Sequence, residues 1–159
     1  MKKIVLKNFV DLSLDEKKMI LSWRNNPIIK KWMYTSDDIS LENHLSFIEN
    51  LKTRDDRYYF LVQEAEEFIG VIDFTNVTSK DLDIGIYSNP LFKGKGDLLL
   101  KEIIKYSFEV LKVKKINAEV FIENEKAYSL YKRFNFKTVD EKIVNTKEVK
   151  CMELLYENR

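Results

Sequence analysis

The sequence predicts one α/β domain of the α+β kind over residues 1–159, with a central mixed sheet and helices on both faces. Strand-like segments joined by short turns fill residues 57–87, which predicts antiparallel hairpins. A helical segment at 97–112 then connects two strand-like segments, and such a crossover makes that pair parallel. With the strands expected at both ends of the chain, the sheet has seven strands.

The N-terminal half opens with one strand at residues 4–10 and continues with two helices. Ser13 begins the first helix through a capping box with Glu16, and Pro27 ends it because the residue before a proline disfavours helical geometry. Ser40 caps the second helix, which runs to Leu51. Three strands follow, at residues 57–63, 67–76 and 82–87.

The C-terminal half alternates helices and strands. The helix at 97–112 carries apolar residues on one face and spans roughly 24 Å at about 1.5 Å per residue. Apolar and polar residues alternate over 115–122, which predicts a strand with two distinct faces. Asn124 caps a helix whose apolar positions recur at helical spacing. The last two strands are expected at 136–145 and 148–156.

Composition excludes several classes of protein. Apolar residues make up 45% and charged residues 33%, as in folded globular proteins. The net charge of +1, from 27 basic and 26 acidic residues, argues against a nucleic-acid partner, which requires a basic face. We expect no membrane span and no signal peptide, because no apolar run approaches the ~20 residues needed to cross a bilayer. Cys151 is the only cysteine, so we expect a cytoplasmic protein without internal disulfides, and no metal site.

The segment before the helix at 97–112 is the main functional signal. Gly94 and Gly96 lie where a strand gives way to a helix, and helix N-termini present unpaired N–H groups to anions. Lys93 and Lys95 add positive charge. A Walker A loop is absent, and a dinucleotide fingerprint fails at Leu99, where its third glycine would stand. The segment therefore predicts a pyrophosphate site, with an ordinary strand–helix turn as the alternative.

Two motifs carry a resemblance to the GNAT N-acetyltransferases. Leu91 to Gly96 resembles their motif A, [RQ]-x-x-G-x-[GA], with Leu91 in place of Arg or Gln. Asn124 to Phe136 resembles motif B, with Asn135 in place of a glycine. The resemblance implies the GNAT fold, with acetyl-CoA as co-substrate in a V-shaped opening between the fourth and fifth strands. It implies cofactor contacts from Ile86, Leu91, Phe92, Lys93, Gly94, Lys95, Gly96, Asn124 and Tyr131.

The expected reaction is direct attack of an amine on the acetyl group. The spacing of Tyr131 alone favours core packing, whereas motif B implies that Tyr131 is the acid toward the departing thiolate. A phenol with a pKa of about 10 is a weaker acid than a thiol near 8.5, so hydrogen bonding to the thiolate is its expected main contribution. Glu119 is the expected base, acting through water, with a salt-bridged strand glutamate as the alternative. Cys151 is expected to be structural, which disfavours an acyl-cysteine route.

Further segments are similar to the GNAT enzymes of pseudaminic acid biosynthesis, which serves flagellin glycosylation. These segments are Trp23–Pro27, Trp32–Tyr34, Ile39–Glu49, Gly85–Pro90 and Glu119–Val120. The resemblance implies acetylation of the 4-amino group of UDP-4-amino-4,6-dideoxy-N-acetyl-β-L-altrosamine. It places Arg24, His44, Thr75, Asn76 and Tyr87 around the nucleotide sugar, and Met33 and Tyr34 around its 6-methyl group.

The residues themselves support an anionic, ring-containing acceptor. Arg24 and His44 suit phosphates, and the aromatic segment Trp32–Tyr34 suits a base or a sugar face. His44 lies at the edge of an apolar helical face, so a partly exposed surface histidine is the alternative there. Two other functions stay open: a protein N-terminal acetyltransferase of the ribosomal-protein type, and a non-catalytic CoA-binding module. A homodimer is also left open.

Overall fold

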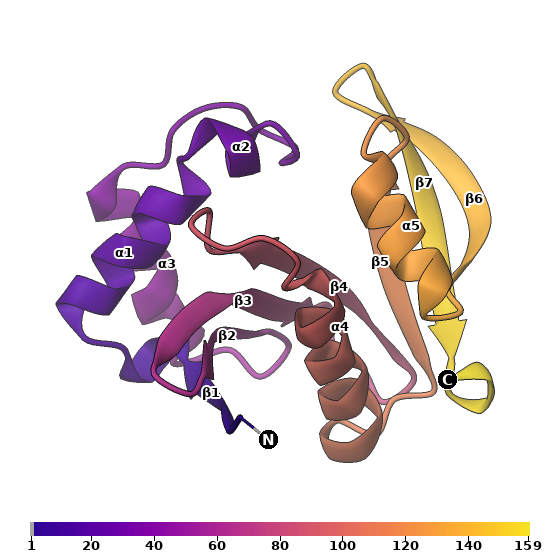
Figure 1. Ribbon diagram of the computed structural model, residues 1–159, viewed down its shortest axis with the longest axis horizontal. Coiled ribbons are helices and arrows are strands. Elements are labelled where there is room, and N and C mark those ends of the chain that lie inside the picture. Colours follow the sequence, from indigo (N-terminus) through magenta and orange to yellow (C-terminus); the bar gives the residue numbers. More distant parts are fainter. Residues whose placement is uncertain (1) are drawn as a thin grey trace.

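The computed structural model describes residues 2–159 and shows a seven-stranded sheet in the order β1-β2-β3-β4-β5-β7-β6 (Figure 1). The pairing of β4 with β5 is parallel and all the others are antiparallel, which confirms the mixed sheet. The strands are β1 Ile4–Asn8, β2 Tyr58–Glu64, β3 Glu67–Thr75, β4 Asp81–Ser88, β5 Lys115–Phe121, β6 Lys137–Val144 and β7 Lys147–Leu155.

Within the described residues 2–159, five α-helices accompany the sheet, and most begin where the sequence predicts. Ser13 and Glu16 form the expected capping box, and Ser40 and Asn124 each accept a backbone N–H at the start of their helix. Asn135 adopts the left-handed conformation (φ 71°) expected of the residue in the motif B glycine position. Within residues 2–159, no helix is both long and apolar enough to cross a membrane. The helices are α1 Leu14–Arg24, α2 Pro27–Lys30, α3 Leu41–Leu51, α4 Gly96–Lys105 and α5 Glu125–Arg133.

Three local features differ from the predictions. The first strand ends at Asn8, because a 3₁₀ turn over Phe9–Asp11 follows it. The short helix α2 was not predicted, since four residues give no helical period. The helix expected over 97–112 leaves α-geometry after Lys105 and continues as a π-helical turn over Tyr106–Val110.

The helices cover both faces of the sheet, and the sheet separates the apolar core into two layers (Figure 1). Helices α4 and α5 pack on one face around Leu99, Leu100 and Ile103, which are fully buried. Helices α1 and α3 pack on the other face through Ile20 and Ile48. The predicted arrangement of helices on both faces is therefore confirmed.

The sheet splays apart between its two central strands. Strands β4 and β5 pair from Asp81–Lys115 to Asp83–Asn117 and then diverge, although both continue for several residues (Figure 1). The antiparallel strands β1–β4 form one arm, and β5–β7 form the other. The V-shaped opening expected between the fourth and fifth strands is therefore present.

Candidate active site

The N-terminus of α4 lacks a side-chain cap, unlike those of the other α-helices. Ser13, Asn26, Ser40 and Asn124 each accept a backbone N–H at the start of α1, α2, α3 and α5. No side chain does so at α4, where Lys95 occupies the N-cap position. The first N–H groups of this helix are therefore free to bind an anion beside the opening of the sheet.

The loop before α4 has the backbone form that an anion cradle requires. Asn89 is buried and anchors the loop, because its side chain donates to the carbonyl of Phe68 and accepts from the N–H of Leu91. Gly94 has a φ of 75° and no atom within 4 Å of the position a Cβ would occupy. Glycine adopts such a positive φ readily, and open space surrounds this residue.

The side chains of this loop contribute less than its backbone. Leu91, at the motif A position of Arg or Gln, is 86% exposed. Lys95 is paired with Glu64 at 2.8 Å, so its charge is already balanced. Lys93 is exposed. A pyrophosphate bound here would therefore depend mainly on backbone N–H groups, and these residues fit such a ligand.

Tyr131 projects from α5 and is 4% exposed. Its ring contacts Phe136 with the centroids 5.2 Å apart, so it fills part of the core as well as offering a hydroxyl group. Within residues 2–159, no side chain forms a hydrogen bond with that hydroxyl. Burial, assisted by the charge of Asp73, raises the pKa of Tyr131, so the phenol stays protonated at neutral pH.

Glu119 lies on the β5 arm, and its side chain is 38% exposed. Its carboxylate accepts hydrogen bonds from Lys142 at 2.6 Å and from the hydroxyl of Tyr34. Burial alone raises the pKa of Glu119, but these two partners outweigh burial and hold the pKa below its ordinary value. The geometry matches the salt-bridged alternative more closely than a buried carboxylate awaiting a proton.

A loop over residues 31–39, called here the bridging loop, joins the two arms of the sheet on the α1 side. The side chain of Asn145, in the β6–β7 turn, donates to the carbonyl of Tyr34 at 2.7 Å. The rings of Trp32 and Tyr34 lie 6.5 and 5.4 Å from that of Phe121 on β5. Met33 is half-buried in this loop. This aromatic segment therefore packs against the arm formed by β5–β7.

Arg24, at the end of α1, is the best-placed residue for an anionic acceptor. Its Nη1 is buried without a hydrogen-bond partner in the described chain. Burial lowers the pKa of Arg24, while the nearby Tyr87 and Tyr59 oppose that shift. The guanidinium remains cationic, so this half-buried side chain carries a positive charge whose buried Nη1 has no hydrogen-bond acceptor in the described chain.

Other predicted acceptor residues are differently placed. Tyr87 faces Arg24 from β4, and Thr75 ends β3 on the same face of the sheet. Asn76 donates to Asp83 at 2.8 Å. His44 is 6% exposed, and its Nε2 lies 2.9 Å from the carbonyl of Lys17. The expectation of a partly exposed surface histidine was wrong, and the contact with α1 favours a structural role over phosphate binding.

Sequence reasoning missed Asp73, a carboxylate on β3. Asp73 pairs with Gly85 of β4, and its oxygens lie where a Cβ of Gly85 would be. It faces the same side of the sheet as Tyr59 and Tyr87. One signal could have found it: a single acid stands inside the otherwise apolar run Phe68–Phe74.

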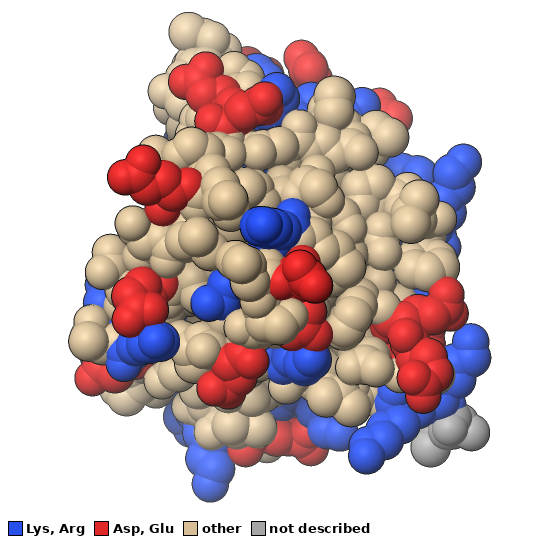
Figure 2. Space-filling model, turned by 90° about the vertical axis from the view of Figure 1, so that its left-hand side faces the viewer, with Lys and Arg blue, Asp and Glu red and all other residues tan. Residues whose placement is uncertain are grey.

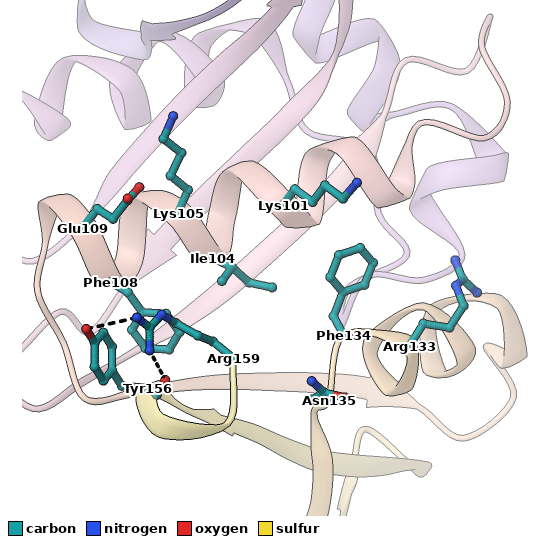
Figure 3. A pocket seen from close by; sticks show the side chains of 10 residues that line it. All are labelled: Lys101, Ile104, Lys105, Phe108, Glu109, Arg133, Phe134, Asn135, Tyr156 and Arg159. Atoms are coloured by element: carbon teal, nitrogen blue, oxygen red, sulfur yellow. Dashed lines mark hydrogen bonds between the residues drawn. The ribbon is translucent and has the colours of Figure 1, made fainter.

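A groove of about 760 Å³ lies between the C-terminal half of α4, the end of α5 and the C-terminus (Figure 3). Lys101, Lys105 and Arg133 line it together with Phe134, but none of the predicted site residues does. Arg159 in this groove donates hydrogen bonds to the carbonyl and to the hydroxyl of Tyr156.

The face shown in Figure 2 carries interspersed acidic and basic side chains rather than a basic patch.

Comparisons with known proteins agree with this geometry. Residues 5–137 match the family model described as an acetyltransferase (GNAT) domain. Two curated relatives are named acetyltransferase PseH and come from Campylobacter jejuni subsp. jejuni, serotypes O:2 and O:23/36. They are 47% and 46% identical to this chain over 138 residues, which is 87% of this chain and 87% of each relative.

Solved structures show the same likeness. The crystal structure of Campylobacter jejuni N-acetyltransferase PseH in complex with acetyl coenzyme A has a TM-score of 0.82 and 39% identity, and covers 97% of this chain and 99% of that one. A spermidine N-acetyltransferase from Vibrio cholerae, solved with CoA and spermine, has a TM-score of 0.88 at 22% identity, covering 98% and 96%. The second likeness shows the fold alone.

Proposed function

Because the chain belongs to the GNAT acetyltransferase family and is an acetyl-CoA-dependent N-acetyltransferase, we propose that its acceptor is the 4-amino group of a UDP-linked amino-dideoxy sugar. The sugar is the pseudaminic acid precursor UDP-4-amino-4,6-dideoxy-N-acetyl-β-L-altrosamine, on the path to glycosylated flagellin. The likeness to the PseH acetyltransferases supports this choice, together with the sequence segments around Arg24, Tyr34 and Tyr87.

One observation carries the acceptor class: the buried Nη1 of Arg24 has no partner in the described chain. Leaving the N–H groups of this buried nitrogen without an acceptor is costly, and a diphosphate would satisfy them with charge-assisted hydrogen bonds. Tyr87 and Tyr59 lie near it, and aromatic side chains suit a base or a sugar. A polycationic acceptor such as a polyamine would be repelled by this charge, although spermidine acetyltransferases share the fold.

The residues divide the work between the two sides of the opening. The free N–H groups of α4 and the Gly94 loop hold the pyrophosphate, while Ile86, Phe92 and Asn124 line the path of the pantetheine arm. The amine attacks the thioester carbonyl, so a C–N bond forms and the C–S bond breaks. Tyr131 donates a hydrogen bond to the departing thiolate. Because its pKa is raised, Tyr131 keeps its proton, and a hydrogen bond describes its role better than full proton transfer does.

The acceptor side is enclosed by the bridging loop. Met33 and Tyr34 provide apolar surface for the 6-methyl group, and Thr75 and Asn76 lie at the end of β3 for polar contacts with the sugar. Glu119 is the base expected from sequence, although the hydrogen bonds from Lys142 and Tyr34 lower its pKa and weaken it in that role.

The test is release of free CoA thiol in the presence of acetyl-CoA and one acceptor at a time. The acceptors are the UDP-4-amino sugar, an N-terminal peptide of ribosomal type, spermidine and none. We expect release with the UDP sugar, raised at least about tenfold in kcat/KM over the others. A signal with the peptide alone would establish the protein acetyltransferase instead, and no release with any acceptor would favour a CoA-binding module.

A further inference from the structure

The Asp73 carboxylate occupies a space that only a glycine opposite it allows. A Cβ on Gly85 would lie 2.3 Å from Oδ2 and 2.7 Å from Oδ1 of Asp73. The two residues are direct partners in the β3–β4 pairing, so the carboxylate lies over the backbone of β4. It therefore reaches the strand that forms one wall of the opening.

Asp73 lies at the level where the opening begins. The last β4–β5 pair is Asp83 with Asn117. Gly85 and Glu119 each lie two residues beyond that pair, on opposite sides of the opening and on the same face of the sheet. Asp73, lying over Gly85, and Glu119 are therefore carboxylates on opposite sides of the opening, while Asp83, in the last pair itself, already accepts from Asn76 and Asn117.

The carboxylates of Asp73 and Glu119 differ in their hydrogen-bond partners. Glu119 accepts hydrogen bonds from Tyr34 and Lys142. No side chain in the part of the chain that the structure describes forms a hydrogen bond or an ion pair with Asp73. A carboxylate free of partners can bind a substrate ammonium and take a proton from it, whereas an engaged one must first lose its partners.

The surroundings of Asp73 suit proton transfer near neutral pH. Burial raises the pKa of Asp73 to about 7, and the positive charge of Arg57 opposes that rise. A base with a pKa near the working pH is the most effective, since it is both ionised and able to accept a proton. The charged and titratable groups that act on it, directly or through a neighbour, are Arg57 before β2, Tyr59 on β2, Tyr87 on β4, Tyr131 on α5 and, beside Tyr59 and Tyr87, Arg24 on α1.

We propose that Asp73, rather than Glu119, accepts the proton that the acceptor ammonium must lose before attack; this rests on the proposed acetyl transfer to a sugar amine. One proton passes from the ammonium to the Asp73 carboxylate and then to solvent. The neutral amine forms the C–N bond as the C–S bond breaks. The nitrogen loses a second proton as the amide forms. The thiolate sulfur, beside the Tyr131 hydroxyl, gains one proton. The sum is amide, free thiol and one proton released.

The test compares two isosteric variants, Asp73→Asn and Glu119→Gln, by the pH dependence of kcat/KM for the UDP-amino sugar. We expect the wild type to lose activity below a midpoint near 7, and Asp73→Asn to fall by about 100-fold at pH 7 and to lose this limb. Glu119→Gln should keep the limb, with kcat/KM lowered about three- to tenfold at every pH because its charge-assisted hydrogen bonds with Tyr34 and Lys142 are weakened. Acetyl-CoA affinity by calorimetry should be unchanged in Asp73→Asn, which shows that the variant is folded.

A second readout is independent of turnover. Carbon-13 NMR of labelled aspartate carboxyls should show one resonance that titrates near pH 7 and is absent in Asp73→Asn. A resonance titrating near 4, an unchanged limb in Asp73→Asn, or loss of the limb in Glu119→Gln would each overturn the proposal. If the wild type acetylates no sugar amine, the proposed acceptor fails, while the titration still decides whether Asp73 is poised as a base.

Discussion

Tyr34, in the bridging loop between α2 and α3, donates its hydroxyl hydrogen to the carboxylate of Glu119 on β5. The bond is reinforced by Asn145, which donates to the carbonyl of Tyr34 at 2.7 Å. The bridging loop thus ties the arm covered by α1 to the arm formed by β5–β7. Because these hydrogen bonds lie on the acceptor side of the opening, they shape the acceptor pocket and make no contact with the pyrophosphate loop.

Removing the Tyr34 hydroxyl should therefore weaken acceptor binding. In Tyr34→Phe we expect the KM for the acceptor to rise about three- to tenfold, as the loss of one charge-assisted hydrogen bond predicts, while the KM for acetyl-CoA stays constant. Steady-state kinetics with each substrate varied in turn measures both values. Tyr128→Phe is the matched control, because Tyr128 lies on α5 near Lys150 and outside the bridging loop. Equal effects of the two variants would count against this role of Tyr34.

Tyr131→Phe should reduce turnover without disturbing the fold. The ring would keep its packing against Phe136, so only the hydroxyl is lost. We expect kcat to fall about 10- to 100-fold, with acetyl-CoA affinity unchanged in calorimetry, since the hydrogen bond to the thiolate forms only as the C–S bond breaks. An unchanged kcat would remove Tyr131 from the mechanism.

The phosphate cradle should depend on backbone more than on side-chain charge. Gly94→Val forces a β-branched residue toward a φ of 75°, and we expect the Kd for acetyl-CoA to rise about tenfold or more. Lys93→Ala removes an exposed cation and should raise the Kd less than threefold. Calorimetric titration ranks the two variants; the reverse ranking would show that side-chain charge holds the cofactor.

Asp73 should make stability depend on pH. Its folded pKa of about 7 exceeds the ordinary 3.8, so the folded state holds the proton more tightly between these values. The contribution of Asp73 to the free energy of unfolding is therefore fully present below about pH 4 and is lost as the pH rises toward 7. Asp73→Asn should raise the free energy of unfolding by roughly 1–3 kcal/mol at pH 8 and leave it unchanged near pH 4. Urea denaturation at both pH values measures this; a destabilised variant at pH 8 would contradict it.

Local chemistry made parts of this structure predictable. The capping box of Ser13 and Glu16 and the cap by Asn124 each depend on residues within a few positions of one another, so sequence reasoning found them. The π-helical turn after Lys105 was missed, because it adds one residue to a turn without altering the apolar pattern.

The candidate site was less predictable where its contacts are distant in sequence. Tyr34 and Glu119 are 85 residues apart, and nothing local to either indicates the bond. Asp73 depends on its glycine partner in the next strand, so its importance appears only once the β3–β4 register is known. The family motifs predicted acetyl-CoA as the co-substrate, which the likeness to the acetyl-CoA-bound PseH structure supports, whereas the contact of His44 with the carbonyl of Lys17 joins residues 27 positions apart and was not indicated by the sequence.

The most direct measurement uses acetyl-CoA labelled with carbon-13 at the acetyl carbonyl and UDP-4-amino sugar labelled with nitrogen-15 at the amine. NMR of the product mixture reports whether the labelled carbon and nitrogen become bonded. We predict a one-bond carbon–nitrogen coupling on the 4-amino group, together with stoichiometric release of free thiol. Thiol release without that coupling, or no reaction of the labelled sugar while a peptide amine is acetylated, would contradict the account.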